Sequence, residues 1–71
     1  MIQMQKNRRE SLVIRLREYK GRRFVDCRLH YPGEDGELRP TRQGFTLSLD
    51  HAGDLADAIV TVARQDHVDD D

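Results

Sequence analysis

Apolar and polar residues alternate with a period of two along residues 11–19 and again along residues 22–31. This period is typical of β-strands that bury one side and leave the other in solvent. Lys20-Gly21 lies between the two stretches and predicts a tight hairpin, because glycine readily adopts the positive φ that such turns need. The apolar positions that we expect to face the core are Leu12, Ile14, Leu16, Val25, Cys27 and Leu29.

Two further strands are predicted downstream. The cluster Pro32-Gly33-Glu34-Asp35-Gly36 predicts a loop. Residues 38–42 contain Pro40, which cannot donate a hydrogen bond to a neighbouring strand, so we expect an edge strand or a bulged strand there. Gly44 interrupts the pattern, and residues 45–49 then alternate again, which predicts a fourth strand whose Phe45 faces the core.

The period changes to that of a helix after the last predicted strand. Ser48 can cap a helix over residues 49–65, and Asp50 then lies in the first turn, where the helix dipole favours negative charge. The apolar positions recur every three to four residues and form one stripe, which contains Ala52, Leu55, Ala56, Ile59, Val60, Val62 and Ala63.

The pattern therefore predicts the α+β class: a four-stranded antiparallel curved meander followed by one C-terminal α-helix. Residues 1–10 lack a period and carry a basic cluster, so we expect a flexible N-terminal arm. Residues 11–65 form the folded domain in this reading. Residues 66–71 are mostly acidic and are expected to be a disordered tail.

Charge is segregated along the chain, although the net charge is only -1. Residues 1–44 carry 11 basic against 6 acidic residues, a net charge of +5, whereas the remainder carries 1 against 7, a net charge of -6. An arginine-rich half attracts phosphate, and an acidic half repels it, so we expect one defined surface to dock on a polyanion.

A chain of 71 residues buries a small core, and a partner chain is the support that we expect, which predicts a homodimer. Cys27 is the single cysteine, so no internal disulfide forms, and we expect an intracellular protein. The longest apolar runs are 3 residues, and no signal-peptide pattern follows Met1, so we expect neither membrane insertion nor export.

The sequence shows no convergent group of reactive residues, so we expect neither an enzyme nor a cofactor. The histidines have no metal-ligand spacing, and Cys27 has no neighbouring ligand to complete a zinc site. In a strand, Cys27 and His30 point to opposite sides, which argues against a nucleophile and its base. No glycine-rich phosphate loop is visible.

Binding of unpaired nucleic acid needs cations along the phosphates and flat side chains on which bases stack. The predicted sheet offers both on its outward side, and we expect Tyr19 and Tyr31 to share that side with the cations. Each tyrosine has an alternative role in closing the core, and Phe24 is undecided. The cations expected there are Arg15, Arg17, Lys20, Arg22, Arg28, Arg39 and Arg42.

Three segments resemble the single-strand-binding domain of the transcriptional coactivator family called positive cofactor four, including its bacterial relatives. They are residues 17–22 (REYKGR), 25–28 (VDCR) and 36–47 (GELRPTRQGFTL), in the family's order and spacing. The resemblance covers about Ser11 to about Ile59. It implies four antiparallel strands and one helix, a dimer formed through the helical side, and sheets that bind single strands or a melted duplex.

The resemblance also assigns roles to residues. It gives base stacking to Tyr19 and Tyr31, and phosphate contact to Arg17, Lys20, Arg22, Arg28 and Arg39. Tyr31 replaces a tryptophan of the eukaryotic member, Thr41 replaces a glycine, and Gln43 replaces a lysine whose load we expect Arg42 to carry. The long regulatory segment of the eukaryotic protein is absent from this sequence, which weakens the case for coactivation by that route.

The function expected from these observations is sequence-tolerant binding of single-stranded DNA, RNA or melted duplex in transcription regulation, replication or repair. Proteins of the transcription machinery are further candidate partners. The expected location is the bacterial cytoplasm and nucleoid, or the nucleus of a eukaryote. Alternatives are a module of the same fold that binds an acidic protein, a ribbon-helix-helix repressor, which lacks the sequence for its second helix, and a hydrolase.

Overall fold

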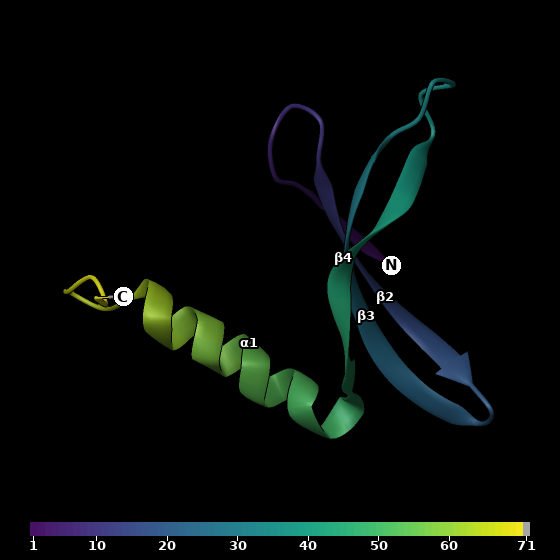
Figure 1. Ribbon diagram of the computed structural model, residues 1–71. Helices are drawn as coiled ribbons and strands as arrows, with labels where there is room; N and C mark the ends of the chain where they lie inside the picture. The colour runs from purple at the N-terminus through teal and green to yellow at the C-terminus, as the bar shows by residue number, and fades with distance from the viewer. Residues whose placement is uncertain (71) are drawn as a thin grey trace.

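The protein folds as one four-stranded antiparallel sheet followed by one helix, in a computed structural model that describes residues 1–70 (Figure 1). The strands lie in the sheet in chain order, β1-β2-β3-β4, which is the predicted meander. The prediction of the fold class is confirmed. The elements are β1 (Ile2–Gln5), β2 (Ser11–Tyr19), β3 (Arg22–Pro32), β4 (Leu38–Ser48) and α1 (Leu49–Ala63).

The hairpin between β2 and β3 has the predicted turn. Tyr19 pairs with Arg22 across it, so the turn itself contains only Lys20 and Gly21. Their φ angles are 52° and 79°. Two positive φ angles are the requirement of a type I′ turn, whose twist matches that of the flanking strands. The turn fixes the register of both strands, from Tyr19 opposite Arg22 to Ser11 opposite His30.

The number of strands was predicted correctly, but two of their positions were not. The irregular arm expected for residues 1–10 is wrong at Ile2–Gln5, which forms strand β1 and pairs antiparallel with β2. The break expected at Gly44 is also wrong, because β4 runs continuously from Leu38 to Ser48 and replaces the two short strands expected there.

Gly44 has a packing role within β4. A Cβ atom at this position would lie 2.6 Å from the carbonyl oxygen of Cys27 and 2.8 Å from Cα of Arg28, which no side chain tolerates without movement of the backbone. Next to it, the pairing of β3 with β4 shifts: Arg28 lies opposite Gly44, and His30 lies opposite Pro40. Pro40 lies beside this bulge in β4, which is an edge strand of the sheet, and a residue without an N–H is tolerated in both settings.

The sheet has two chemically different faces. We call the first the polar face; its positions on β2 and β3 are Ser11, Val13, Arg15, Arg17, Tyr19, Arg22, Phe24, Asp26, Arg28 and His30. We call the second the helix face; its apolar positions are Leu12, Ile14, Leu16, Val25, Cys27, Leu29, Phe45 and Leu47. Alternation of side chains across a strand produces both sets.

Helix α1 contacts β3 and β4 and then extends away from the strands (Figure 1). A cavity of about 290 Å³ between helix and sheet is lined by residues of the helix face and by Ala52, Leu55, Ala56 and Ile59. No residue of α1 is buried in the single chain. Ser48 is the N-cap residue, but its hydroxyl makes no capping bond and instead lies 3.3 Å from Nδ1 of His51.

Much apolar surface of the helix side stays exposed in one chain. Phe45, expected in the core, is 49% exposed, and Leu16 is 60% exposed. Val13, at 2% exposure, is the one buried hydrophobic residue of the described chain, although it lies on the polar face. The residues after Ala63 form no further helix or strand up to residue 70, and Asp71, the end of the tail expected to be disordered, lies outside the described residues.

Candidate nucleic-acid interface

Arginine side chains occupy adjacent positions across β2 and β3 on the polar face. Arg15 and Arg17 lie two residues apart on β2, opposite Asp26 and Phe24 of β3, so an acid and an aromatic ring lie between the cations of the two strands. Arg28 continues the row toward the bulge, and Arg22 ends it beside the hairpin turn. The helix packs on the other face, so this row of cations is open to a partner.

A buried carboxylate organises the centre of the polar face. Asp26 is 2% exposed and accepts hydrogen bonds from Nε of Arg28 at 3.2 Å and from Nη1 of Arg17 at 3.5 Å. Nη1 of Arg28 also donates to the carbonyl oxygen of Thr41 at 3.0 Å. Arg28 is thereby tied to two strands, whereas Arg17 keeps half of its side chain in solvent. Asp26 fixes the positions of the Arg17 and Arg28 side chains, and both remain partly exposed.

Aromatic rings lie beside the cations near the hairpin turn. The guanidinium of Arg17 lies over the ring of Phe24 at 5.9 Å from its centroid, and the ammonium of Lys20 lies over the ring of Tyr19 at 5.4 Å. Tyr19 is 66% exposed. A solvated aromatic ring among cations has the composition of a surface on which unpaired bases stack while phosphates are bound nearby.

Tyr31 does not share this surface. It lies opposite Arg39 in the pairing of β3 with β4, and it belongs to the same alternating set as Leu29 and Cys27. Tyr31 therefore lies on the helix face of β3, near the β3–β4 loop, while Tyr19 lies on the polar face at the other end of the sheet. The prediction that both tyrosines share the outward side is wrong in its placement of Tyr31.

Arg39 lies beside Tyr31, at the end of the sheet near the β3–β4 loop. Its Nη2 donates to Oδ2 of Asp35 at 2.7 Å, and its side chain covers Gly33, where a Cβ atom would lie 2.7 Å from the arginine Nε. Arg42 lies in the irregular part of β4 between Pro40 and Gly44, and it is exposed. The structure thus brings together Arg17, Tyr19, Lys20, Arg22 and Arg28, and it separates Tyr31 and Arg39 from them. Arg42 follows Thr41, whose carbonyl oxygen accepts from Arg28.

Two residues of the polar face, Asp26 and His30, were not identified as site residues from the sequence. Asp26 holds the arginines, and its signal was present: an acid on the outward side of β3, two residues before Arg28. His30 is 7% exposed and lies on the polar face near the bulge. A single histidine at a strand end carries no such signal, because its burial depends on residues that are distant in sequence.

Cys27 is the one cysteine of the chain, and its side chain is partly buried. Partial burial, and then the charge of Asp26, raise the pKa of the Cys27 thiol above its ordinary value of 9.0, which makes it a weaker source of thiolate. Among residues 1–70, no group of three or more His, Cys, Asp or Glu side chains is placed to hold a metal ion. No helix in that range is long and apolar enough to cross a bilayer.

An open antiparallel sheet with arginines on one face and one helix against the other places the chain in a class of small α+β folds. Residues 4–58 match the profile of the family described as Transcriptional Coactivator p15 (PC4), and the chain belongs to this family. No curated protein matches the chain significantly.

The fold is also similar to a crystal structure of a PC4 homolog from Burkholderia pseudomallei. In its orthorhombic form the TM-score is 0.86 at 31% sequence identity, and the match covers 92% of this chain and 88% of that one. In its tetragonal form the TM-score is 0.83 at 31% identity, with 90% and 94% covered. The recognition of the family from the three sequence segments is confirmed.

Proposed function

We propose that the polar face binds single-stranded or locally melted DNA with little sequence preference, and that the protein acts in transcription regulation, replication or repair without catalysing a reaction. The observation that carries this proposal is the row of arginines held around Asp26, with exposed Tyr19 at its end. Membership of the coactivator family supports the same conclusion.

The geometry favours single strands over a regular duplex. Arg17, Arg22 and Arg28 lie on adjacent β-strands of the sheet, so their guanidinium groups can contact successive phosphates of a flexible nucleic-acid chain. An exposed aromatic ring can stack only on a base that is unpaired and accessible. Arginine suits both tasks, because its planar guanidinium pairs with phosphate in a bidentate manner and also stacks on bases.

We further propose that the functional unit is a homodimer formed through the helix side. An apolar groove of about 500 Å³ lies along α1, lined by Leu55, Ala58, Ile59, Val62 and Ala63. Exposed apolar surface of this extent on a small chain indicates an interface. The similarity to a bacterial homolog favours action in the cytoplasm, at the nucleoid.

Fluorescence anisotropy with labelled oligo-dT, duplex DNA and single-stranded RNA tests the binding proposal. We expect oligo-dT to bind more tightly than duplex at low salt. Tyr19→Ala should weaken oligo-dT binding by about 1–3 kcal/mol, the typical contribution of a base stacked on an aromatic ring. Oligo-dT that stays free at low salt and micromolar protein would reject the proposal and favour an acidic protein as the partner.

Analytical ultracentrifugation tests the dimer separately. Ile59→Asp places a charge on the apolar stripe of α1 and should yield monomers at concentrations where the native chain is dimeric. Thr61→Asp is the matched control, because helical periodicity places residue 61 on the opposite side of α1. Circular dichroism of both variants reports whether the helix remains. Dimers that tolerate Ile59→Asp would contradict this interface.

A further inference from the structure

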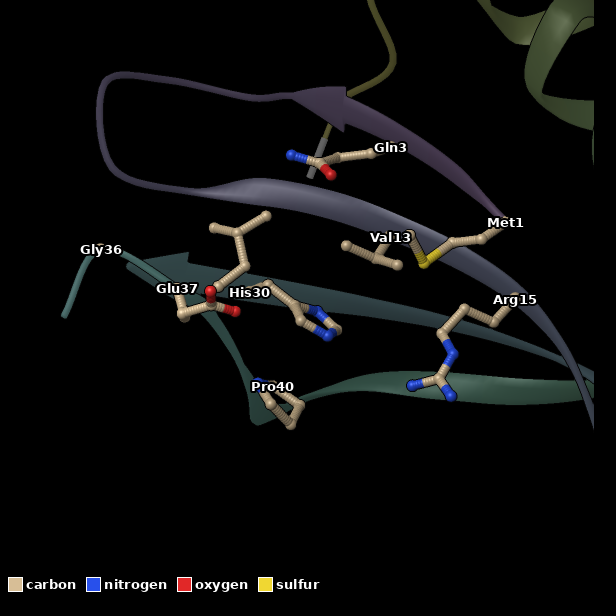
Figure 2. A pocket seen from close by; sticks show the side chains of 9 residues that line it. Met1, Gln3, Val13, Arg15, His30, Gly36, Glu37 and Pro40 are labelled. Carbon is tan, nitrogen blue, oxygen red and sulfur yellow. The ribbon is translucent and has the colours of Figure 1, made fainter. Parts of the chain in front are cut away.

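A cavity of about 500 Å³ opens on the polar face beside the row of arginines (Figure 2). Val13 and His30, both buried, form its floor on β2 and β3. Gln3 of β1 borders one side, and Leu38 and Pro40 at the start of β4 border another. Its size lies within the range of pockets that hold small organic ligands, roughly 300–1000 Å³.

His30 presents an unpaired acceptor to this cavity. Its Nδ1 lies 3.3 Å from the backbone oxygen of Arg28. A carbonyl oxygen can only accept, so Nδ1 carries the proton in the neutral ring and Nε2 is left as an acceptor. Nε2 has no hydrogen-bond partner among residues 1–70, although the side chain is only 7% exposed. No buried side-chain nitrogen or oxygen of the described residues lacks a hydrogen-bond partner, so Nε2 is accessible to water at the cavity, and a ligand that donates to it would replace that water.

Opposite charges flank the histidine. Figure 2 shows the carboxylate of Glu37 on one side of the His30 ring and the guanidinium of Arg15 on the other. Neither Glu37 nor Arg15 forms an ion pair within the part of the chain that the structure describes. The cavity therefore offers acceptors on one side of His30 and donors on the other, and its lining also includes the apolar side chains of Val13 and Leu38.

We propose that this cavity binds one unpaired guanine base of a strand that lies on the polar face. Guanine alone among the DNA bases has two adjacent donors, N1–H and the N2 amino group, which match the two oxygens of a carboxylate. Its other edge carries two acceptors, O6 and N7, which an arginine reads in a bidentate manner. Glu37 and Arg15 provide this pair of complementary groups, and Nε2 of His30 accepts a further hydrogen bond.

The inference deepens the proposed function and rests on it. Arg15 and Val13 lie on β2, as do Arg17 and Tyr19. A single-stranded nucleic acid bound along the polar face therefore passes the mouth of the cavity. The phosphate contacts then supply affinity for any sequence, and the cavity adds a preference at one nucleotide. Thymine, whose single N3–H lies between two carbonyl groups, does not fit the carboxylate in this manner.

The first test compares oligo-dT with the same oligonucleotide carrying one central guanine. We expect the guanine to tighten binding about tenfold, near the lower end of the roughly 5- to 150-fold discrimination of one bidentate base contact. Glu37→Gln should reduce this ratio to about twofold or less. Glu34→Gln is the matched control: it removes the same charge from the same exposed loop, outside the cavity, and should leave the ratio unchanged.

The second test does not depend on strand binding. Deoxyguanosine monophosphate, titrated into labelled protein, should shift the NMR signals of His30 and Val13, whereas thymidine monophosphate should not. Oligo-dT binding with no guanine preference and no shift at His30 would overturn the cavity and leave the proposed function intact. No strand binding, with a guanine-specific shift at His30, would overturn the proposed function and retain the cavity. Equal loss of preference in Glu37→Gln and Glu34→Gln would also reject the cavity.

Discussion

Replacing Asp26 with asparagine removes one charge from the centre of the polar face and changes its shape little. In the native chain the carboxylate accepts from Arg17 and Arg28 and is 2% exposed. An asparagine side chain has one oxygen to accept with, and its amino group donates, so at least one guanidinium N–H then faces another donor. We expect Asp26→Asn to destabilise the fold.

The magnitude follows from the burial of the two partners. Arg28 has a side chain that is 23% exposed, and breaking a buried ion pair of this kind costs about 3–5 kcal/mol. Arg28 keeps its bond to the carbonyl of Thr41, which favours the lower end of that range. Arg17 is half exposed, and its pair contributes about 0–1 kcal/mol. The expected loss is therefore about 3 kcal/mol of unfolding free energy.

Urea denaturation followed by circular dichroism measures this loss at one fixed protein concentration, because the stability of a dimer depends on concentration. Asp35→Asn is the matched control. It breaks the short ion pair between Asp35 and Arg39, in which both side chains are more than half exposed. The free energy of unfolding should fall by less than about 1 kcal/mol. Equal and small losses in the two variants would refute the role given to Asp26.

Other predictions follow from single features of the fold. Gly44→Ala should lower the free energy of unfolding by about 1–3 kcal/mol in urea denaturation, because its Cβ would meet the backbone of Cys27. Gly53→Ala, which has open space around it in α1, should raise the free energy of unfolding by about 0.5–1 kcal/mol. An unchanged stability of Gly44→Ala would contradict the close approach of β3 and β4. Burial and the charge of Asp26 raise the pKa of Cys27, so iodoacetamide should alkylate Cys27 more slowly at pH 8 in the folded chain than in the urea-unfolded chain. The alkylation rate of the folded chain, measured over a pH series, should reach its midpoint above pH 9.0. A midpoint at or below pH 9.0 would contradict the environment described for Cys27.

Local rules were sufficient to predict the hairpin and the helix from sequence. Alternation over residues 11–19 and 22–31, on either side of Lys20-Gly21, predicts strands β2 and β3, and the turn needs only two positive φ angles. Strand β1 was missed because it is four residues long, and its alternation of Ile2 and Met4 with glutamines is too short to distinguish from an irregular segment. Its pairing with β2 stabilises it through contacts that no local pattern shows.

Gly44 was misread for a related reason. A glycine between two alternating stretches usually marks a break, but here the missing side chain allows β4 to approach Cys27 and Arg28 of β3. Only the pairing of the two strands distinguishes these meanings. Val13 is a similar case: alternation places it opposite to Leu12 and Ile14, on the outward side, but it is buried there and lines the floor of a cavity.

The cationic part of the candidate site was predicted better than its aromatic part. Period-two alternation places Arg17, Tyr19 and Arg28 on one face, as the structure has them. Tyr31 follows His30 directly, so the same alternation puts Tyr31 on the opposite face. Its expected position beside the cations therefore conflicted with the alternation of β3. Base stacking by Tyr31 stays a prediction that Tyr31→Ala would test.

The central claim is that one face of the sheet, and not the positive charge of the chain in general, contacts the phosphates. Arg22 and Arg23 are adjacent in β3 and lie on opposite faces: Arg22 on the polar face beside Tyr19, and Arg23 paired with Glu18 at 3.3 Å. The direct test is the slope of log affinity against log salt for oligo-dT. With four or five phosphates bound per subunit, the native slope should be about −3, at roughly 0.7 per contact. Arg22→Ala should make it shallower by about 0.7, and Arg23→Ala should leave it unchanged; equal changes in the two variants would contradict the account.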